Sequence, residues 1–279
     1  MPHIDPSWQG AAVVAAVLGL LAVLSWRAGW ALGRAALAEA GLVVGLYATW
    51  QLIGSRTRLE LGDARAHALS LFHAEQALHL PSELAFQQAV TPHRWLVELA
   101  NGYYLYGHFN PVIALLAWTW WRHRSAYPRV RLLLALLTVA AFAVHVLPVA
   151  PPRLLPELGF QDVALQYGES VYGALDTGLS GQLLAMPSLH VGWAVLVAYV
   201  AVTTSRSPWR WLVVAHPVLM SVVVVVTANH WWADGAACTA LLAGCLAGDA
   251  GVRRLVRSRH RAAPAARAPA PREPVRSLV

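Results

Sequence analysis

The chain has 279 residues, of which 57% are hydrophobic and 13% are charged, whereas roughly a quarter of the residues in a soluble domain are charged. A water-soluble fold of this size cannot bury so much apolar surface, so we predict an integral membrane protein. All 21 basic residues are arginine and outnumber the 14 acids, giving a net charge of +7. Cys238 and Cys245 lie in one apolar run, about 10 Å apart along a helix, which excludes a disulfide bond between them.

Seven apolar segments are near the length of about 20 residues that a helix needs to cross a bilayer. In chain order they cover residues 9–26, 35–54, 96–121, 130–149, 188–205, 209–228 and 233–250. We therefore predict an all-α fold, a multi-pass membrane bundle of about seven transmembrane helices. The expected parts are two amino-terminal transmembrane helices (1–54), an outer interfacial helical segment (55–95), the membrane core (96–252) and a disordered basic cytoplasmic tail (253–279).

The arginines divide unevenly between the two ends of these helices. Sixteen lie after the first helix, in the connections between helices 3 and 4 and between helices 5 and 6, or after the last helix, and five lie in the remaining connections. Because short cytoplasmic loops carry the positive excess, we predict that the amino terminus lies outside and the carboxyl terminus lies in the cytoplasm. This explains the charge without nucleic acid, and we predict the plasma membrane as the location.

Two outer connections are too long to be simple turns. One contains a helix-like stretch, residues 64–80, whose apolar positions fall largely on one side: Ala64, Ala68, Leu71, Phe72 and Leu78. Its polar positions include His67, Glu75 and His79. We interpret it as an interfacial helix along the outer leaflet, which explains the spacing of Glu75 and His79 better than a metal site does. The other connection is residues 150–187.

Three polar motifs lie at the predicted outer ends of helices, where ionisable side chains are costly and are therefore functional candidates. The first is APPRLLP at 150–156, which holds Arg153 among prolines. The second is MPSLHVG at 186–192, where a helix begins; Ser188 and the free N–H groups of its first turn would make an anion site. The third is TANHWWADG at 227–235, in which Asp234 follows His230 by four residues and can hydrogen-bond its imidazole.

Two histidines, a carboxylate, an arginine and a helix amino terminus suit phosphoryl transfer. One imidazole, held in one tautomer by the carboxylate, can attack phosphorus, and the other can protonate the departing oxygen. The arginine and the N–H groups can hold the equatorial oxygens as charge develops. This arrangement requires no metal ion. The alternative interpretation is a set of polar helix ends at the interface, with Arg153 as a snorkelling side chain.

Further polar residues lie near these motifs. Asn101, Tyr104 and His108 are spaced three and four apart and share one face of the predicted helix 96–121. They would either bind a head group or form hydrogen bonds between helices. His145 lies two turns before Arg153 and would line the same pocket, or it would be structural.

A PSxH motif followed about 40 residues later by HxxxD, in a small multi-pass protein, resembles the type 2 phosphatidic acid phosphatase superfamily. The forms PSLH and NHxxxD are closer to its inositol phosphorylceramide synthase-like branch, and the resemblance covers roughly residues 60–250. It implies that His230 becomes phosphohistidine, that Asp234 orients it, and that His190 is the general acid and later the base. Ser188 and Arg153 would bind phosphate. The possible substrate pocket comprises Asn101, Tyr104, His108, His145 and Asn229.

The sequence departs from the family pattern at phosphate-binding positions. The lysine of the first motif is matched by Val146, and Leu154 follows Arg153 in place of proline. The Ser-Arg pair before the third motif is matched by Val223 and Val224. Two cationic phosphate ligands are therefore missing, and the synthase-like branch also lacks some of these residues.

The resemblance implies a metal-independent membrane enzyme without a cofactor, whose catalytic core is residues 96–252. Its substrate would be a lipid phosphate or a polyprenyl (pyro)phosphate at the outer leaflet, among membrane lipids and without a nucleic-acid partner. Water as the acceptor would make it a phosphatase, and a lipid alcohol would make it a phosphotransferase, as in inositol phosphorylceramide synthases. A third hypothesis is a non-catalytic lipid-binding or transport protein. The sequence identifies neither the lipid nor a protein partner.

Overall fold

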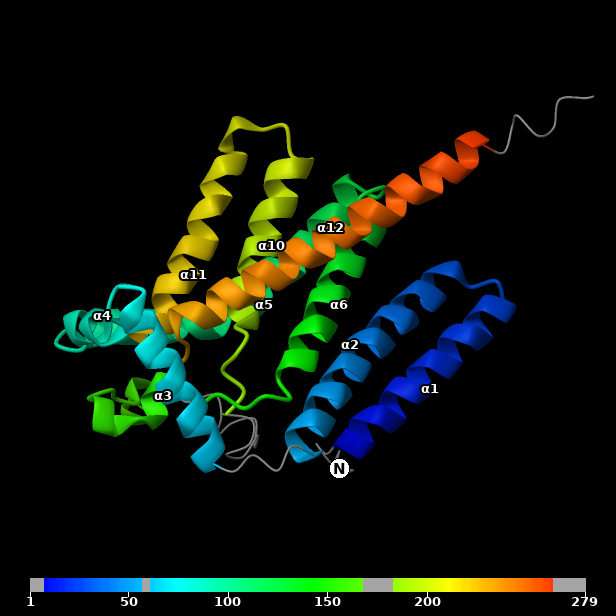
Figure 1. Ribbon diagram of the computed structural model, residues 1–279. Helices are drawn as coiled ribbons and strands as arrows, with labels where there is room; N and C mark the ends of the chain where they lie inside the picture. Colours follow the sequence, from blue (N-terminus) through cyan, green and yellow to red (C-terminus); the bar gives the residue numbers. More distant parts are fainter. Residues whose placement is uncertain (1–7, 57–60, 168–182, 263–279) are drawn as a thin grey trace, which may run out of the picture.

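The structure is a computed structural model that describes residues 8–56, 61–167 and 183–262 (Figure 1). Within these residues every regular element is a helix, and an isolated bridge joins Val149 to Leu184. This confirms the predicted all-α membrane bundle. The parts of our predictions that concern residues 1–7, 168–182 and 263–279 lie outside the described residues.

All seven predicted segments contain helices. They are α1 (Trp8–Arg27), α2 (Ala31–Arg56), α5 (Arg94–Arg122), α6 (Tyr127–Val144), α10 (Leu189–Thr204), η3 (Pro208–Val214) continued by α11 (Ala215–Val226), and α12 (Trp232–Ala262). Among the described residues, four stretches are long and apolar enough to cross a membrane: Trp8–Arg27, Tyr127–Val144, Pro208–Val226 and Trp232–Arg259. Helix α10 is equally apolar but has only 16 residues. Together these helices indicate a multi-pass membrane protein.

Helices α1 and α2 form an antiparallel pair at one side of the bundle (Figure 1). Helix α2 packs against α6, and an ion pair between Glu39 and Arg131 joins the two. The pair therefore adds to the core without contributing any of the three polar motifs.

The core is formed where α5, α6, α10 and α12 pack together. Its buried side chains include Val112, Leu115, Leu133, Leu137, Leu196, Cys238 and Leu242. Helices α10 and α12 approach most closely at Gly192, where an added β-carbon would lie 2.2 Å from the sulfur of Cys238. This close approach sets the beginnings of α10 and α12, which bear the second and third motifs, side by side.

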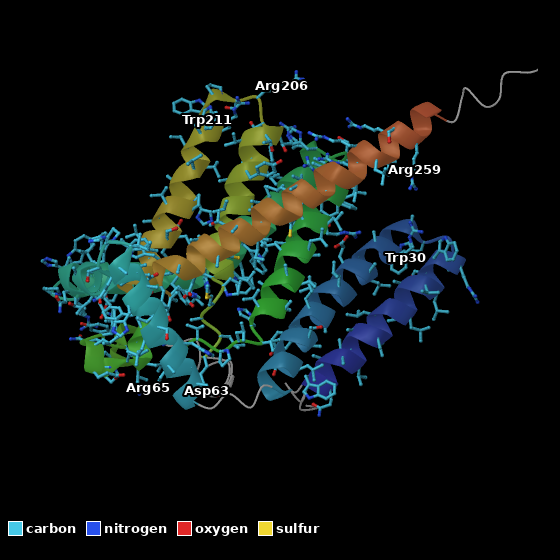
Figure 2. All side chains as sticks on the ribbon, viewed as in Figure 1. Trp30, Asp63, Arg65, Arg206, Trp211 and Arg259 are labelled. Carbon is cyan, nitrogen blue, oxygen red and sulfur yellow. The ribbon has the colours of Figure 1, made fainter. Side chains whose placement is uncertain are left out.

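The two ends of the bundle differ in their charged residues. Figure 2 shows Arg206 and Arg259 at one end, and Asp63 and Arg65 at the other. The three polar motifs lie toward the end that holds Arg65, because η1 (Pro152–Leu154) and η2 (Pro156–Leu158), which precede α7 (Val163–Gln166), pack there with Trp231 against α3 (Leu61–Ala77). Arg65 thus lies at the opposite end of the bundle from Arg206 and Arg259 (Figure 2).

Residues 61–93 form two helices, α3 and α4 (Glu83–Val90), rather than the one that we predicted for residues 64–80. Ala64 and Ala68 are fully buried, as expected for the apolar face. Leu78 was wrongly assigned to that face: it is 71% exposed, because α3 ends at Ala77 and the chain turns through a positive φ at His79. Glu75 was wrongly assigned to the polar side and is 3% exposed, since it lies seven residues after Ala68 and points the same way.

The predicted disordered tail begins too early. Helix α12 continues to Ala262, so residues 253–262 are helical. Arginine is a good helix former, and no proline or glycine occurs between residue 252 and Pro264. The apolar pattern identified the membrane-spanning part of α12, but it could not show that the helix continues through residues 253–262.

The close contact at Gly192 predicts a stability effect. Gly192→Ala should lower the free energy of unfolding by about 1–3 kcal/mol, because the new methyl group overlaps the sulfur of Cys238. Cys238→Ala in the same chain removes that sulfur and should restore most of the loss. Thermal unfolding of the four proteins of this cycle in detergent measures both effects. Unchanged unfolding of Gly192→Ala would show that the helices are not in this contact.

Candidate active site

The second and third motifs bring two histidines together. His190 lies in the first turn of α10 and His230 lies just before α12, with ring centroids 5.6 Å apart. A tight turn positions His230, because the backbone N–H groups of Asn229 and His230 both donate to the carbonyl of Val224, at 3.0 and 3.1 Å. Ala228 adopts a φ of 52° within this turn. The reversal between α11 and α12 therefore holds the imidazole of His230 toward α10.

The hydrogen bonds of His230 identify its tautomer. Nδ1 lies 2.8 Å from the carbonyl oxygen of Ala185 and 3.2 Å from Oδ2 of Asp234. Both partners are acceptors, so Nδ1 carries the proton and Nε2 carries the lone pair. The same Oδ2 accepts a hydrogen bond from the backbone N–H of Trp231, at 2.9 Å. Asp234 is fully buried, and the predicted His230–Asp234 pair is present although α12 begins only at Trp232.

Arg153 lies against the turn that holds His230. Its guanidinium donates to Oδ1 of Asn229 at 2.7 Å, and its Nε lies 3.5 Å from Oδ2 of Asp162. The backbone N–H of Arg153 also donates to the carbonyl of Ala228, at 2.9 Å. Arg153 is 4% exposed, which makes it a buried cation against the turn that holds His230 rather than a snorkelling side chain.

Ser188 is the N-cap residue of α10 and is fully buried. Its hydroxyl accepts a hydrogen bond from the N–H of Val191 at 3.5 Å, and its own N–H donates to the carbonyl of Asp234 at 3.0 Å. The second contact ties the start of α10 to the first turn of α12. The predicted helix amino terminus is therefore present beside His230.

His190 belongs to a stack of four rings, and the other three hold its plane. Tyr104 lies on one side of the imidazole at 4.1 Å and His108 on the other at 4.0 Å, and Trp193 continues the stack from His108 at 4.5 Å. Asn101 is buried on the same face of α5. The predicted face of Asn101, Tyr104 and His108 thus packs beside His190. His145, buried at the end of α6, lies within electrostatic reach of His230.

The positions of the missing cationic ligands are exposed or lie in an apolar cluster. Val146 is 59% exposed, whereas Val223 and Val224 are buried in a cluster with Tyr104, Val191 and Met220. The apolar side chains of Val223 and Val224 therefore suit their surroundings.

Some functional groups could not be found from the motifs. The carbonyl of Ala185 is a backbone group, and only the folded loop brings it to Nδ1 of His230. Trp193 was missed although it follows His190 by three residues and therefore lies on the same helix face. Glu75 was missed because its charge led us to place it on the polar side of α3, although its spacing from Ala68 puts it on the apolar face.

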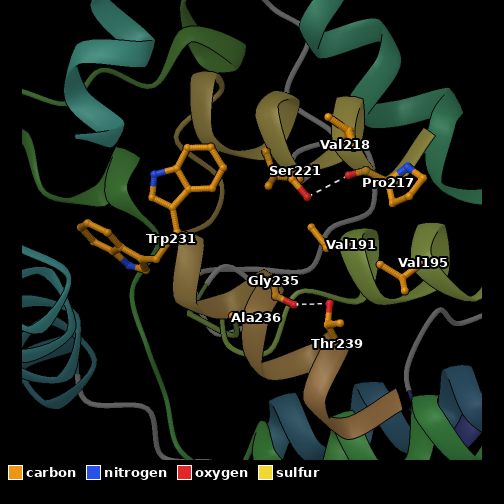
Figure 3. Close-up of a pocket in the computed structure, with 11 residues that line it drawn as sticks. Val191, Val195, Pro217, Val218, Ser221, Trp231, Gly235, Ala236 and Thr239 are labelled. Carbon is orange, nitrogen blue, oxygen red and sulfur yellow. Dashed lines mark hydrogen bonds between the residues drawn. The ribbon is translucent and has the colours of Figure 1, made fainter. Parts of the chain in front are cut away.

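An apolar groove lies between α10, α11 and α12 (Figure 3). Its volume is about 230 Å³, and its lining includes Val191 and Trp231, the neighbours of the two histidines in sequence. The hydroxyls of Ser221 and Thr239 donate within their own helices, each at 2.8 Å (Figure 3). With these hydroxyls satisfied, the groove offers a mainly apolar surface.

A family model described as the PAP2 superfamily matches residues 69–247. The chain belongs to the PAP2 superfamily. The match runs from α3 into α12 and includes all three polar motifs. No curated protein and no solved structure matches the chain. Membership indicates a phosphatase-type enzyme, with phosphatase or phosphotransferase activity in general, and agrees with the resemblance seen in the motifs.

The buried hydrogen bond between His230 and Asp234 predicts the effect of its removal in this PAP2 protein. Asp234→Asn should lower kcat for phosphate release from a lipid phosphate by roughly 10²–10⁴-fold, because the imidazole loses the carboxylate that fixes its tautomer and offsets its positive charge. Asp249→Asn is a matched control, since Asp249 pairs with Arg129 and Arg253 farther along the same helix. Equal rates for the two variants would contradict the assigned tautomer.

Proposed function

We propose that this chain is a membrane lipid phosphatase or phosphotransferase that acts on a lipid-linked phosphate through a phosphohistidine at His230. The observation that carries the proposal is the position of Nδ1 of His230 between the carbonyl of Ala185 and the carboxylate of Asp234. This leaves the lone pair on Nε2, the nitrogen that can attack phosphorus. Membership in the PAP2 superfamily supports the same class of chemistry.

In the proposed reaction, Nε2 of His230 forms a bond to phosphorus while the bond from phosphorus to the leaving oxygen breaks. His190 donates a proton to that oxygen, and Arg153 with the N–H groups at the start of α10 binds the equatorial oxygens. His190 then removes a proton from the acceptor oxygen, which attacks phosphorus and breaks the phosphorus–nitrogen bond. The ring separation of 5.6 Å is consistent with a phosphoryl group held beside both imidazoles. The proposed steps require no metal ion.

The apolar groove supports a lipid-linked substrate. It lies beside α11 and α12, both within the stretches that are apolar enough to cross a membrane. Its lining residues Val191 and Trp231 are adjacent in sequence to His190 and His230. A hydrocarbon chain in this groove would remain in an apolar environment while its phosphate reached the histidines.

The second candidate is transfer of a phospho-headgroup to a lipid alcohol, as in inositol phosphorylceramide synthases. It is supported by the PSLH and NHxxxD forms of the motifs and by the burial of the reacting groups. His230 and Arg153 are 6% and 4% exposed, and Asp234 is fully buried. Burial restricts the access of water to a phosphohistidine, so an alcohol delivered from the membrane would compete well with hydrolysis.

An acceptor screen tests the proposed reaction and separates its two forms. The purified protein, in detergent with EDTA, is given phosphatidic acid or a polyprenyl phosphate carrying labelled phosphate, with and without added inositol or a diacylglycerol whose acyl chains differ from those of the phosphatidic acid. We expect an acid-labile phosphohistidine in the native protein and in His93→Ala, an exposed control, but not in His230→Ala. The label leaves as inorganic phosphate if water is the acceptor and enters a new phospholipid or inositol phosphate if an alcohol is.

Two results of this screen would contradict the proposal. Unchanged turnover in His230→Ala would exclude the covalent mechanism. A folded native protein that releases or transfers no phosphate from phosphatidic acid or from polyprenyl phosphates would instead favour a lipid-binding or transport role.

We also propose that the chain lies in the plasma membrane with its site at the outer face and its carboxyl terminus in the cytoplasm, from the distribution of arginines. Single cysteines can be placed at Leu165 and Trp209, which are 69% and 72% exposed, after both native cysteines are changed to alanine. An impermeant thiol reagent should label Leu165→Cys in intact cells and Trp209→Cys only after permeabilisation. The reverse pattern would invert the proposed orientation.

A further inference from the structure

Two carboxyl groups are buried together beside the first turn of α12. Glu75 on α3 and Glu83 on α4 are each 3% exposed. Burial of an ionised carboxylate is costly, and two like charges in one site are costlier still. The proposed reaction uses neither residue, so their burial calls for a separate explanation.

Glu75 binds the helix that carries Asp234. Its Oε1 accepts a hydrogen bond from the backbone N–H of Ala233, at 2.7 Å. Ala233 lies in the first turn of α12, where backbone N–H groups have no partner within the helix. Trp232 fastens the same turn to the connection between α3 and α4, because its indole N–H donates to the carbonyl of Pro81 at 2.8 Å. Glu75 therefore caps the catalytic helix from a neighbouring helix.

One oxygen of each carboxyl group has no hydrogen-bond partner. Among the described residues, Oε2 of Glu75 and Oε1 of Glu83 are buried without one. The two side chains are close enough to interact, because a hydrogen bond with Glu83 is among the effects that raise the pKa of Glu75. Two carboxyl groups can share a hydrogen bond only if one of them is protonated. A hydrogen bond between these side chains would therefore give the buried oxygens a partner and would need one proton in the pair.

The surroundings favour that proton. Glu75 lies on α3, outside the membrane-spanning stretches, and burial is the largest of the effects that raise its pKa to about 9. The hydrogen bond with Glu83 and the charges of Glu83 and Asp234 act in the same direction, opposed by the N–H of Ala233. No arginine is among the effects on this pKa, and two arginines of the same part of the fold pair with other acids: Arg65 with Glu157 and Arg153 with Asp162.

We propose that Glu75, sharing one proton with Glu83, is a positioning residue that holds the first turn of α12, and with it Asp234 and His230, in the geometry for phosphoryl transfer. This inference rests on the proposed function. Loss of the proton would leave two adjacent carboxylates near the charge of Asp234. Their repulsion would break the hydrogen bond that the N–H of Ala233 donates to Glu75. Activity should therefore fall at alkaline pH by this route.

The shared proton can be tested without turnover, by infrared spectroscopy of the full-length protein in detergent. We expect the C=O band of a protonated carboxyl at neutral pH, and its loss as the pH rises through about 9. The band should be absent from Glu75→Gln and Glu83→Gln. Glu98→Gln is the matched control, because Glu98 is an exposed acid that pairs with Arg94. Absence of the band from the native protein, or its persistence in Glu75→Gln, would overturn the shared proton.

The positioning role is tested by kinetics. Glu75→Gln can still accept from Ala233 and donate to Glu83, so it should keep its activity at neutral pH and lose the alkaline decline of the native enzyme. Glu75→Leu can do neither and should lower kcat by roughly 10²-fold, with a smaller change in KM. Identical pH profiles for the native protein and Glu75→Gln would overturn the role.

A measurement that needs no substrate separates this inference from the proposed function. The Nδ1–H proton of His230, hydrogen-bonded to Asp234, should give a downfield NMR signal that persists in Glu75→Gln and disappears in Glu75→Leu. If lipid phosphates are not turned over, the proposed function fails, and this signal still decides the positioning role. A signal unchanged in Glu75→Leu would overturn it.

Discussion

The hydrogen bond between His230 and Asp234 is the interaction on which the rest of the site depends. Several backbone contacts at the start of α12 hold it in place. The N–H groups of Asn229 and His230 donate to the carbonyl of Val224, and the N–H of Ser188 donates to the carbonyl of Asp234. The imidazole of His230 also donates to the carbonyl of Ala185. These contacts join α10, α11 and α12 at one end of the bundle. The packing of these helices therefore fixes the positions of His230 and Asp234 relative to each other.

Much of this arrangement could be predicted from local rules. Apolar runs located the helices of the bundle, because a membrane-spanning helix has a fixed minimum length. The spacing of four residues predicted the contact of His230 with Asp234, and the spacings in α5 predicted the shared face of Tyr104 and His108. What spacing could not show was that this face would stack on His190, because that depends on how α5 and α10 pack.

The failures share a physical cause. Helix ends were placed by composition, yet α3 stops at Ala77 and α12 continues to Ala262, where hydrogen bonding and not hydropathy decides. Glu75 was assigned by its charge, although a carboxyl that can hold a proton and cap a helix is stable in a buried position. The hydrogen bond that His230 donates to Ala185 is accepted by a main-chain oxygen, which every residue has and which no sequence motif can therefore identify.

The shortness of α10 has a consequence for the bilayer itself. Sixteen residues rise about 24 Å, whereas the hydrocarbon core is about 30 Å thick. Its neighbour α12 is nearly twice as long, with 31 residues. The mismatch is relieved either by thinning of the membrane around α10 or by a depression in which His190 and Ser188 lie below the level of the surrounding head groups. In both cases the lipid substrate that we propose would reach the histidines by moving sideways in its own leaflet, without leaving the membrane.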